Sequence, residues 1–182
     1  MDEAARAAHH ELDTPSTWVV RWAHRIPAGG RVLDVACGNG RHARFFAARG
    51  HPVEAVDRDP AKLASLAGIP RISARSADLE GGQWPYLGER FAGIVVANYL
   101  HRPLFAHLLA ALAAGGVLIY KTFAAGNERY GRPSNPAHLL TPGELLDVVH
   151  GRLRVIAYEE LHVSEPRPAV VQRICAIKPS VS

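Results

Sequence analysis

The stretch VLDVACGNGRHA, residues 32–43, joins a short apolar run to a glycine-rich loop and decides how the rest of the chain is interpreted. Gly38, Gly40 and Ala43 fit the G-x-G-x-x-G/A pattern, in which a strand and a helix start approach a nucleotide. Asp34, however, lies four residues before the first of these glycines. A carboxylate so close to the loop would repel the phosphates of a dinucleotide. The stretch predicts a cofactor loop, and its aspartate argues against the most familiar ligand of such loops.

The composition is that of one globular domain. Of the 182 residues, 48% are hydrophobic and 21% are charged, which is ordinary for a chain with a single core. We expect a flexible N-terminus over residues 1–13 and one domain over residues 14–182. The 21 Lys and Arg residues exceed the 17 Asp and Glu residues by four, but they form no basic run. A nucleic-acid partner is therefore not favoured.

Other sequence features bear on location and partners. The start MDEAARAAHHELD carries acids and lacks the continuous apolar region of a secretory signal. No apolar run approaches the roughly 18 residues of a membrane span. The chain has two cysteines, Cys37 and Cys175, and no spacing typical of a metal site. We therefore predict a cytoplasmic monomer or homodimer with two free thiols, no metal and no membrane association.

Strand-like and helix-like segments alternate along the chain, which predicts a parallel α/β sheet. The expected strands are 31–37, 52–57, 71–78, 91–98 and 116–123, and the expected helices are 14–26, 41–50, 60–68, 102–116 and one that starts at the TPGE capping box, 141–144. Thr14 is the expected cap of the first helix, with Pro15 in its first turn. Paired glycines at 115 and 116 are expected to end the fourth.

The last two strand-like segments, 152–163 and 169–178, are separated only by the turn SEPRP and should pair as an antiparallel hairpin. The fold class predicted is a doubly wound, mostly parallel, seven-stranded Rossmann-like sheet that ends in this hairpin. The segment 124–140, AAGNERYGRPSNPAHLL, has no clear period and is rich in Gly, Pro and Asn. It follows the fifth strand, at the edge where α/β ligands bind, and we interpret it as a substrate lid.

Acidic and amide side chains follow successive strands at this same edge. Asp57 ends the second strand and is placed to accept both hydroxyls of a ribose. Asp78 follows the third strand, where it could accept from an adenine amino group with Leu79 against the ring. Asn98 ends the fourth strand, near the reacting end of the cofactor. Three simpler interpretations stay open: Asp34 holds loop amides, Asp57 is a capping acid, and Asp78 is only solvated.

Asp34 favours S-adenosylmethionine over a dinucleotide, because this ligand has no phosphate and carries an ammonium that a carboxylate attracts. The segments VLDVACGNGRHA, VDRD, ADLE and VANYLHRPLF then resemble the successive motifs of class I S-adenosylmethionine-dependent methyltransferases, and GNGRHARFFAARGHPVEAVDRDP with EELHV resembles their small tellurite-resistance type. The family's first motif often has a glycine where this chain has Ala36. The cofactor-binding residues predicted are Asp34, Ala36, Gly38, Gly40, Asp57, Arg58, Asp78, Leu79 and Asn98.

Methyl transfer from a sulfonium needs a positioned acceptor in a dry pocket, and a base only where the acceptor must lose a proton. The candidates for a catalytic role are Tyr99, His101 and His162. Tyr120, Lys121 and the lid residues Glu128, Arg129, Tyr130, Arg132 and His138 are further candidates for contact with the acceptor. Cys37 is not expected to be a nucleophile, since no histidine partner is evident.

The function predicted is methyl transfer from S-adenosylmethionine to a small-molecule acceptor. NYLH, residues 98–101, lacks the prolines that follow the fourth strand in the amino-methylating enzymes of nucleic acids, which favours a small acceptor. Three alternatives stay open: a non-catalytic module that binds the cofactor, an RNA methyltransferase, and an NAD-dependent oxidoreductase.

Overall fold

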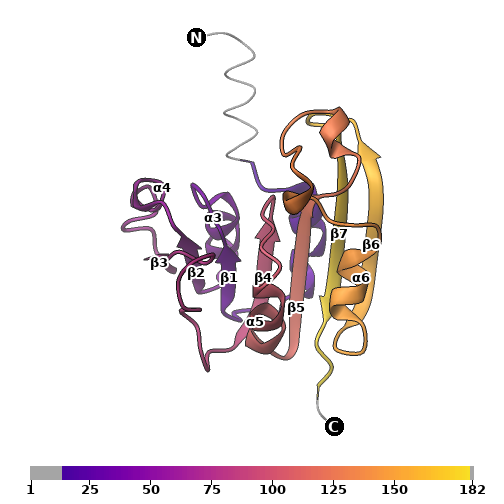
Figure 1. Ribbon diagram of the computed structural model, residues 1–182. Helices are drawn as coiled ribbons and strands as arrows, with labels where there is room; N and C mark the ends of the chain where they lie inside the picture. Colours follow the sequence, from indigo (N-terminus) through magenta and orange to yellow (C-terminus); the bar gives the residue numbers. More distant parts are fainter. Residues whose placement is uncertain (1–13, 181–182) are drawn as a thin grey trace.

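The computed structural model describes residues 14–180, which form a seven-stranded sheet with helices on both faces (Figure 1). The strands are β1 (Val32–Val35), β2 (Val53–Asp57), β3 (Ile72–Ser76), β4 (Phe91–Ala97), β5 (Leu112–Phe123), β6 (Arg154–Val163) and β7 (Ala169–Ile177). Their order is β3-β2-β1-β4-β5-β7-β6. The first five strands pair in parallel, and β7 is antiparallel to both of its neighbours. The predicted fold class is confirmed, including the final hairpin.

The helices divide between the two faces of the sheet. On one face α2 (Thr17–Trp22), α3 (Arg41–Ala47) and α4 (Pro60–Ala64) contribute Trp18, Phe46 and Leu63 to one buried cluster. On the other face α5 (Leu104–Ala111) and α6 (Glu144–Val149) contribute Leu108 and Leu145 to a second cluster. Each fully buried side chain of this size stabilises the fold by roughly 1.5–3 kcal/mol. The two cores hold the sheet rigid beneath its carboxyl edge.

Four of the expected helices differ from the prediction at one or both ends. The helices expected over 41–50 and 60–68 end earlier, at Ala47 and Ala64. The first helix begins after Ser16 rather than Thr14, because the backbone of Ser16 is extended, with a ψ angle of 131°. The Ser16 amide donates to His42 Nε2 at 3.1 Å. The helix expected over 102–116 ends at Ala111, and Leu112 already pairs with Phe91 of β4. Lys178 Nζ donates to the carbonyl of Leu112 at 2.8 Å, which satisfies a carbonyl that the helix end leaves open.

The capping box expected at the start of α6 is half formed. Glu144 Oε2 accepts from the Thr141 amide at 2.8 Å and from the Thr141 hydroxyl at 3.0 Å. The Glu144 amide donates to the Thr141 carbonyl at 3.0 Å rather than to its hydroxyl. The threonine hydroxyl therefore acts as a donor to the glutamate, and the first residue of the helix carries the anchoring carboxylate.

The segment 124–140 lies beyond the carboxyl end of β5 and beside the β6–β7 hairpin, at the top of Figure 1. It contains two short 3-10 turns, Asn127–Arg129 and Pro136–His138. Ala124 and Leu140 are bridged and buried, and Asn127 accepts from the Val170 amide at 3.2 Å. Both ends of the segment are therefore fixed to the sheet, while most of the residues between them are exposed.

Across residues 14–180, no helix is long and apolar enough to cross a membrane, and no group of His, Cys, Asp or Glu is arranged to hold a metal ion. Both cysteines are free and buried. Burial raises the pKa of the Cys37 thiol, so this thiol stays protonated at neutral pH. The residues of the predicted flexible N-terminus, 1–13, lie outside the described part of the chain.

Candidate functional site

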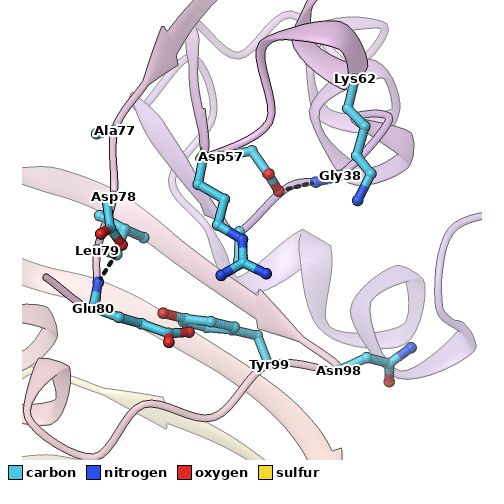
Figure 2. Close-up of a pocket in the computed structure, with 11 residues that line it drawn as sticks. Gly38, Asp57, Lys62, Ala77, Asp78, Leu79, Glu80, Asn98 and Tyr99 are labelled. Carbon is cyan, nitrogen blue, oxygen red and sulfur yellow. Dashed lines mark hydrogen bonds between the residues drawn. The ribbon is translucent and has the colours of Figure 1, made fainter.

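Two adjoining cavities open where β1, β2 and β4 end. The Asp78 cavity, of about 270 Å³, is lined by Ala36, Gly38, Asp57, Arg58, Lys62, Ala77, Asp78, Leu79, Glu80, Asn98 and Tyr99 (Figure 2). The Asp34 cavity, of about 320 Å³, is lined by Asp34, Ala36, Cys37, Gly38, Asn39, Arg41, His42, Lys62, Ala97 and Asn98. They share four lining residues, so together they form one cleft. Eight of the nine predicted cofactor residues line it, and Gly40 does not.

The backbone of the glycine loop shows why Gly38 and Gly40 differ. Both have positive φ angles, +57° and +75°, a region that glycine adopts without strain. A Cβ on Gly38 would meet no atom within 4 Å, whereas one on Gly40 would lie 2.4 Å from Leu66 Cδ2. Gly38 therefore leaves open backbone toward the cleft. Gly40 allows α3 to pack closely against Leu66, which is a structural role.

Ala36 also has a positive φ angle, +51°, although its Cβ disfavours that conformation. The resemblance drawn above places a glycine here in related proteins, and the observed backbone explains that preference physically. Strained backbone of this kind persists where the surrounding structure enforces it, and it concentrates at binding sites. Ala36 lies between the two cavities and lines both.

Asp57 holds the cleft in shape. Its Oδ2 accepts from the Gly38 amide at 2.8 Å, as Figure 2 shows, and its Oδ1 accepts from the Asp59 amide at 3.0 Å. The residue is buried yet lines the Asp78 cavity. Each carboxylate oxygen can accept a second hydrogen bond. The structure therefore gives Asp57 a loop-holding role and leaves it acceptor capacity for the predicted ribose hydroxyls.

Asp34 is 1% exposed and lies beside the start of α3. Its Oδ2 accepts from the Ala43 amide at 2.9 Å, which is the amide-holding interpretation that the sequence left open. Burial raises the pKa of Asp34 to about 7, with the nearby Asp57 acting in the same direction. The residue also lines the Asp34 cavity. A cation in that cavity would favour the ionised carboxylate.

Asp78, Leu79 and Tyr99 form the other end of the cleft. Asp78 is exposed, and its Oδ1 accepts from the Glu80 amide at 3.0 Å. Hydrogen bonds from the Glu80 and Gly81 amides lower the pKa of Asp78. Leu79 is buried beside it. Burial, with a hydrogen bond to Glu80, raises the pKa of the Tyr99 hydroxyl. This hydroxyl therefore stays protonated at neutral pH and is poorly suited to act as a base.

Lys62 was not singled out from the sequence, although it lines both cavities. It lies on α4 three residues after Asp59, whose side chain caps the helix by accepting from the Ala61 amide. Lys62 Nζ lies 3.8 Å from Asp59 Oδ2. The helical spacing could have revealed Lys62 in the sequence. Asp59 caps α4 at the edge of the cleft, and a residue three positions later lies on the same side of the helix.

A third cavity adjoins the cleft through Asn98. This Arg132 cavity is lined by Asn98, Phe123, Arg132, Pro133, Ser134, Asn135, His138 and Arg167. Asn98 has a φ angle of +57°, and it is the residue that all three cavities share. Arg132 and His138 come from the segment 124–140 and Arg167 comes from the turn between β6 and β7.

Two of the three predicted catalytic residues do not line these cavities. His101 is half-buried in the turn before α5, and His162 is exposed on β6 with its ring 4.7 Å from that of Tyr130. Tyr99 lines the Asp78 cavity, away from the Arg132 cavity. His42, which sequence reasoning passed over, lines the Asp34 cavity. Burial lowers the pKa of His42 to about 3, and its neutral ring accepts from the Ser16 amide.

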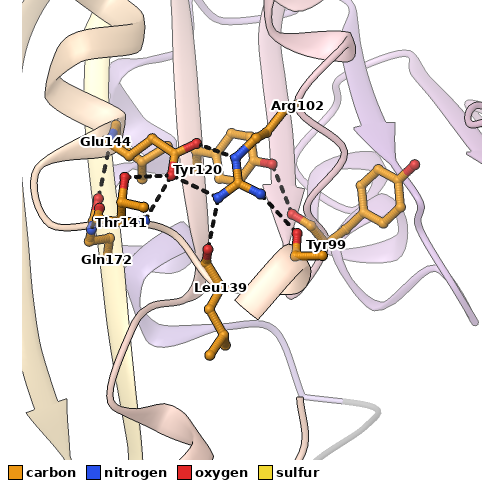
Figure 3. Close-up of polar contacts among 9 residues, drawn as sticks. Tyr99, Arg102, Tyr120, Leu139, Thr141, Glu144 and Gln172 are labelled. Carbon is orange, nitrogen blue, oxygen red and sulfur yellow. Dashed lines mark hydrogen bonds and ion pairs between the residues drawn. The ribbon is translucent and has the colours of Figure 1, made fainter. Parts of the chain in front are cut away.

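Arg102, also missed, joins the cleft to the segment 124–140 (Figure 3). Its guanidinium donates to the carbonyls of Ala137 and Leu139, each at 2.8 Å, and to the carboxylate of Glu144. Beside it the Tyr120 hydroxyl donates to the Tyr99 carbonyl at 2.8 Å. No local sequence pattern reveals such a cluster, because its members are brought together only by the path of the loop.

Both the sequence and the fold of this chain are similar to those of known methyltransferases. Residues 32–116 match a family model described as a methyltransferase domain. Among solved structures, TehB from Haemophilus influenzae has a TM-score of 0.73 at 19% identity, covering 90% of this chain and 62% of that one. This chain thus spans about three fifths of that protein's length. No curated protein matches the sequence.

Two further structures match along nearly their whole length. A TehB-like SAM-dependent methyltransferase from Corynebacterium glutamicum has a TM-score of 0.67 at 22% identity, covering 96% of this chain and 95% of that one. The glycopeptide N-methyltransferase MtfA, complexed with S-adenosyl-L-homocysteine, has a TM-score of 0.62 at 20% identity, covering 92% of both chains. The predicted resemblance agrees with the description of the matched domain and with the fold that these structures share.

Proposed function

We propose that the chain is a class I S-adenosylmethionine-dependent methyltransferase, which transfers the methyl group of S-adenosylmethionine to a small-molecule acceptor. The family-model match over residues 32–116 and the fold shared with TehB support this proposal. The observation that carries the proposal is the position of Asn98, which borders both cavities of the cleft and the Arg132 cavity. Donor and acceptor would meet at this residue. The reaction is assigned to the cytoplasm, in keeping with two free buried cysteines.

The residues of the cleft fit the cofactor. A Cβ built on Gly38 would meet no atom within 4 Å, so a ligand can approach the backbone there closely. Asp57 has acceptor capacity for a ribose, and Asp78 and Leu79 offer an acceptor beside an apolar surface for adenine. Asp34 supplies negative charge for the ammonium of the methionine end. These assignments follow the predicted roles and are supported by the lining of the two cavities.

When bound, the cofactor would supply an electrophilic methyl carbon for in-line attack by a lone pair of the acceptor, with the sulfur as the leaving group that keeps the electrons of the C–S bond. This chain's residues contribute by positioning the two reactants and excluding water. Asn98 and Ala36 both have left-handed backbone where donor and acceptor would meet. The segment 124–140, held by Arg102, covers the acceptor side. An acceptor with a titratable proton would release it to solvent or to His138, which lines the Arg132 cavity.

Calorimetry with S-adenosylmethionine, S-adenosylhomocysteine and NADH tests the cofactor. We expect micromolar binding of the first two and none of NADH. Absent or only millimolar binding of the adenosyl ligands would overturn the proposal, and tight NADH binding would favour an oxidoreductase instead.

A labelled-methyl assay over metabolite and RNA pools tests the acceptor. Label in small molecules is the expected result. Label confined to RNA, with binding that weakens steeply with salt, would indicate an RNA methyltransferase. Cofactor binding without transfer to either pool would indicate a non-catalytic binding module.

A further inference from the structure

The Arg132 cavity gathers two arginines from segments far apart in the chain. Arg132 lies in the segment 124–140, and Arg167 lies in the turn between β6 and β7. His138 also lines the cavity, and no lining residue is acidic. The acids closest along the chain, Glu128 and Glu165, do not line it, and Glu128 Oε2 accepts from the Gly126 amide at 2.8 Å. The lining can therefore carry only positive charge.

Neither arginine is occupied elsewhere within residues 14–180. Arg31, Arg102 and Arg173 all form ion pairs with glutamates. Arg132 and Arg167, by contrast, make no ion pair or hydrogen bond through their side chains in the described chain. Guanidinium groups favour planar, bidentate binding of carboxylate and phosphate. Two of them in one cavity, without an internal partner, form a site for an anion.

The same cavity has an apolar wall. Phe123, near the end of β5, and Pro133 are both half-buried and line it together with the arginines. An apolar wall beside a cationic rim suits a ligand that combines an anionic group with an apolar body. The wall lies beside Asn98, so the body of a ligand held by the arginines would extend toward the cofactor cleft.

We propose that Arg132 and Arg167 bind a carboxylate or phosphate group of the methyl acceptor, and that Phe123 contacts the acceptor's apolar part. This proposal rests on the proposed function, because it assigns the Arg132 cavity to the acceptor. It narrows the acceptor to organic anions and excludes neutral or cationic molecules as preferred substrates. It also gives the segment 124–140 a binding role through Arg132 and His138.

The test uses the full chain saturated with S-adenosylhomocysteine and four probes: benzoate, phenyl phosphate, neutral benzamide and inorganic phosphate. Ligand-observed NMR should detect benzoate or phenyl phosphate, and not benzamide. Arg132→Gln and Arg167→Gln should each lower the affinity for the anionic probe by about tenfold. This is the loss expected when one charge-assisted hydrogen bond is removed. Arg152→Gln is the matched control, because it removes the same charge from an exposed residue just before β6, at the opposite end of the sheet.

Equal binding of benzoate and benzamide would overturn the proposal, and so would unchanged anion affinity in both arginine variants. If inorganic phosphate binds as tightly as phenyl phosphate, the site holds a free anion and the role of Phe123 is wrong. Calorimetry of S-adenosylhomocysteine with each variant separates this outcome from failure of the proposed function. Loss of cofactor binding in the unmodified protein overturns the function, whereas intact cofactor binding without anion binding overturns only the acceptor class.

Discussion

Arg102 and Glu144 form a two-point ion pair, with Nε 2.7 Å from Oε1 and Nη2 2.9 Å from Oε2. The pair joins the turn before α5 to the first residue of α6. Because the same guanidinium also donates to two carbonyls of the segment 124–140, one side chain fixes the C-terminal end of that segment. Although partial burial opposes ionisation, the contacts from Arg102 and Thr141 lower the pKa of Glu144.

Replacing Arg102 by alanine should therefore loosen this segment without disturbing the cofactor cleft. We expect a loss of about 1–3 kcal/mol in the free energy of unfolding. Amide hydrogen exchange should become faster at residues 138–140. The affinity for S-adenosylhomocysteine should stay unchanged, and a large fall in that affinity would contradict the separation of the two sites. Arg102→Lys keeps the charge but lacks the planar fork, so it should give an intermediate result.

Asp34→Asn should stabilise the ligand-free protein at pH 8. The asparagine oxygen can still accept from the Ala43 amide, while the cost of ionising a buried carboxyl disappears. The pKa of Asp34 is raised to about 7 in the folded chain, from 3.8, so the native state loses stability as the pH rises from 4 toward 7. The gain at pH 8 should be on the order of 1–4 kcal/mol. The difference between the two proteins should shrink as the pH falls and nearly vanish below about pH 4, where the carboxyl is protonated in both the folded and the unfolded state. Equal stability at pH 8 would refute the cause.

Asp34→Asn should also weaken binding of the cofactor, because it removes the negative charge that attracts the cofactor's ammonium. At pH 7.5 we expect Asp34→Asn to lower the affinity for S-adenosylmethionine by about tenfold. Binding to the unmodified protein should also weaken as the pH falls from 7.5 to 5.5, because Asp34 takes up a proton. Methylthioadenosine lacks the amino-acid end and is the control ligand. If its affinity changes in parallel, Asp34 acts only through the shape of the loop.

Ala36→Gly and Gly38→Ala form a matched pair at the same loop. The backbone at both residues is left-handed, with φ angles of +51° and +57°. Glycine at 36 should relieve strain and raise the stability by up to about 1 kcal/mol, and alanine at 38 should lower it by about 1–2 kcal/mol. Thermal unfolding measures both. Gly38→Ala should also weaken binding of the cofactor, because the new methyl group would project into the cleft that Gly38 lines.

Asp57→Ala should weaken binding of methylthioadenosine by on the order of 1–3 kcal/mol. Because Asp57 also holds the Gly38 amide, the variant alone does not separate ribose contact from loop shape. The 2′,3′-dideoxy analogue of methylthioadenosine does so. Removal of the hydroxyls should reduce affinity for the unmodified protein and have little effect in the variant. An equal reduction in both proteins would mean that the ribose binds elsewhere.

The sequence was sufficient to predict the strands, their alternation with helices and the acids at their ends. These features depend on local pattern, and the carboxyl ends of parallel strands meet at one edge whatever the loops do. Asp57, Asp78 and Asn98 were brought to one cleft for this reason. Asp34 was predicted at the edge, but its bond to the Ala43 amide depends on the start of α3, which composition does not determine.

The residues that sequence reasoning placed wrongly or missed depend on the paths of loops. His162 was expected near the site, yet the strand order β5-β7-β6 puts its strand at the far edge of the sheet. Arg102 and Glu144 are 42 residues apart, and Arg132 and Arg167 meet from separate loops. Such contacts form only after the sheet has set the positions from which the loops start.

The shared position of Asn98 also bears on how proteins of this shape diversify. The cofactor side of the cleft is built from strand ends and the glycine loop, whereas most of the Arg132 cavity is built from the segment 124–140 and the turn between β6 and β7. Insertions and substitutions in those two loops would alter acceptor choice while the donor half stays intact. Among residues 14–180, Asn98 is the residue that lines all three of these cavities. If the two sites bind donor and acceptor as proposed, a change of acceptor could therefore proceed through the two loops while Asn98 is kept.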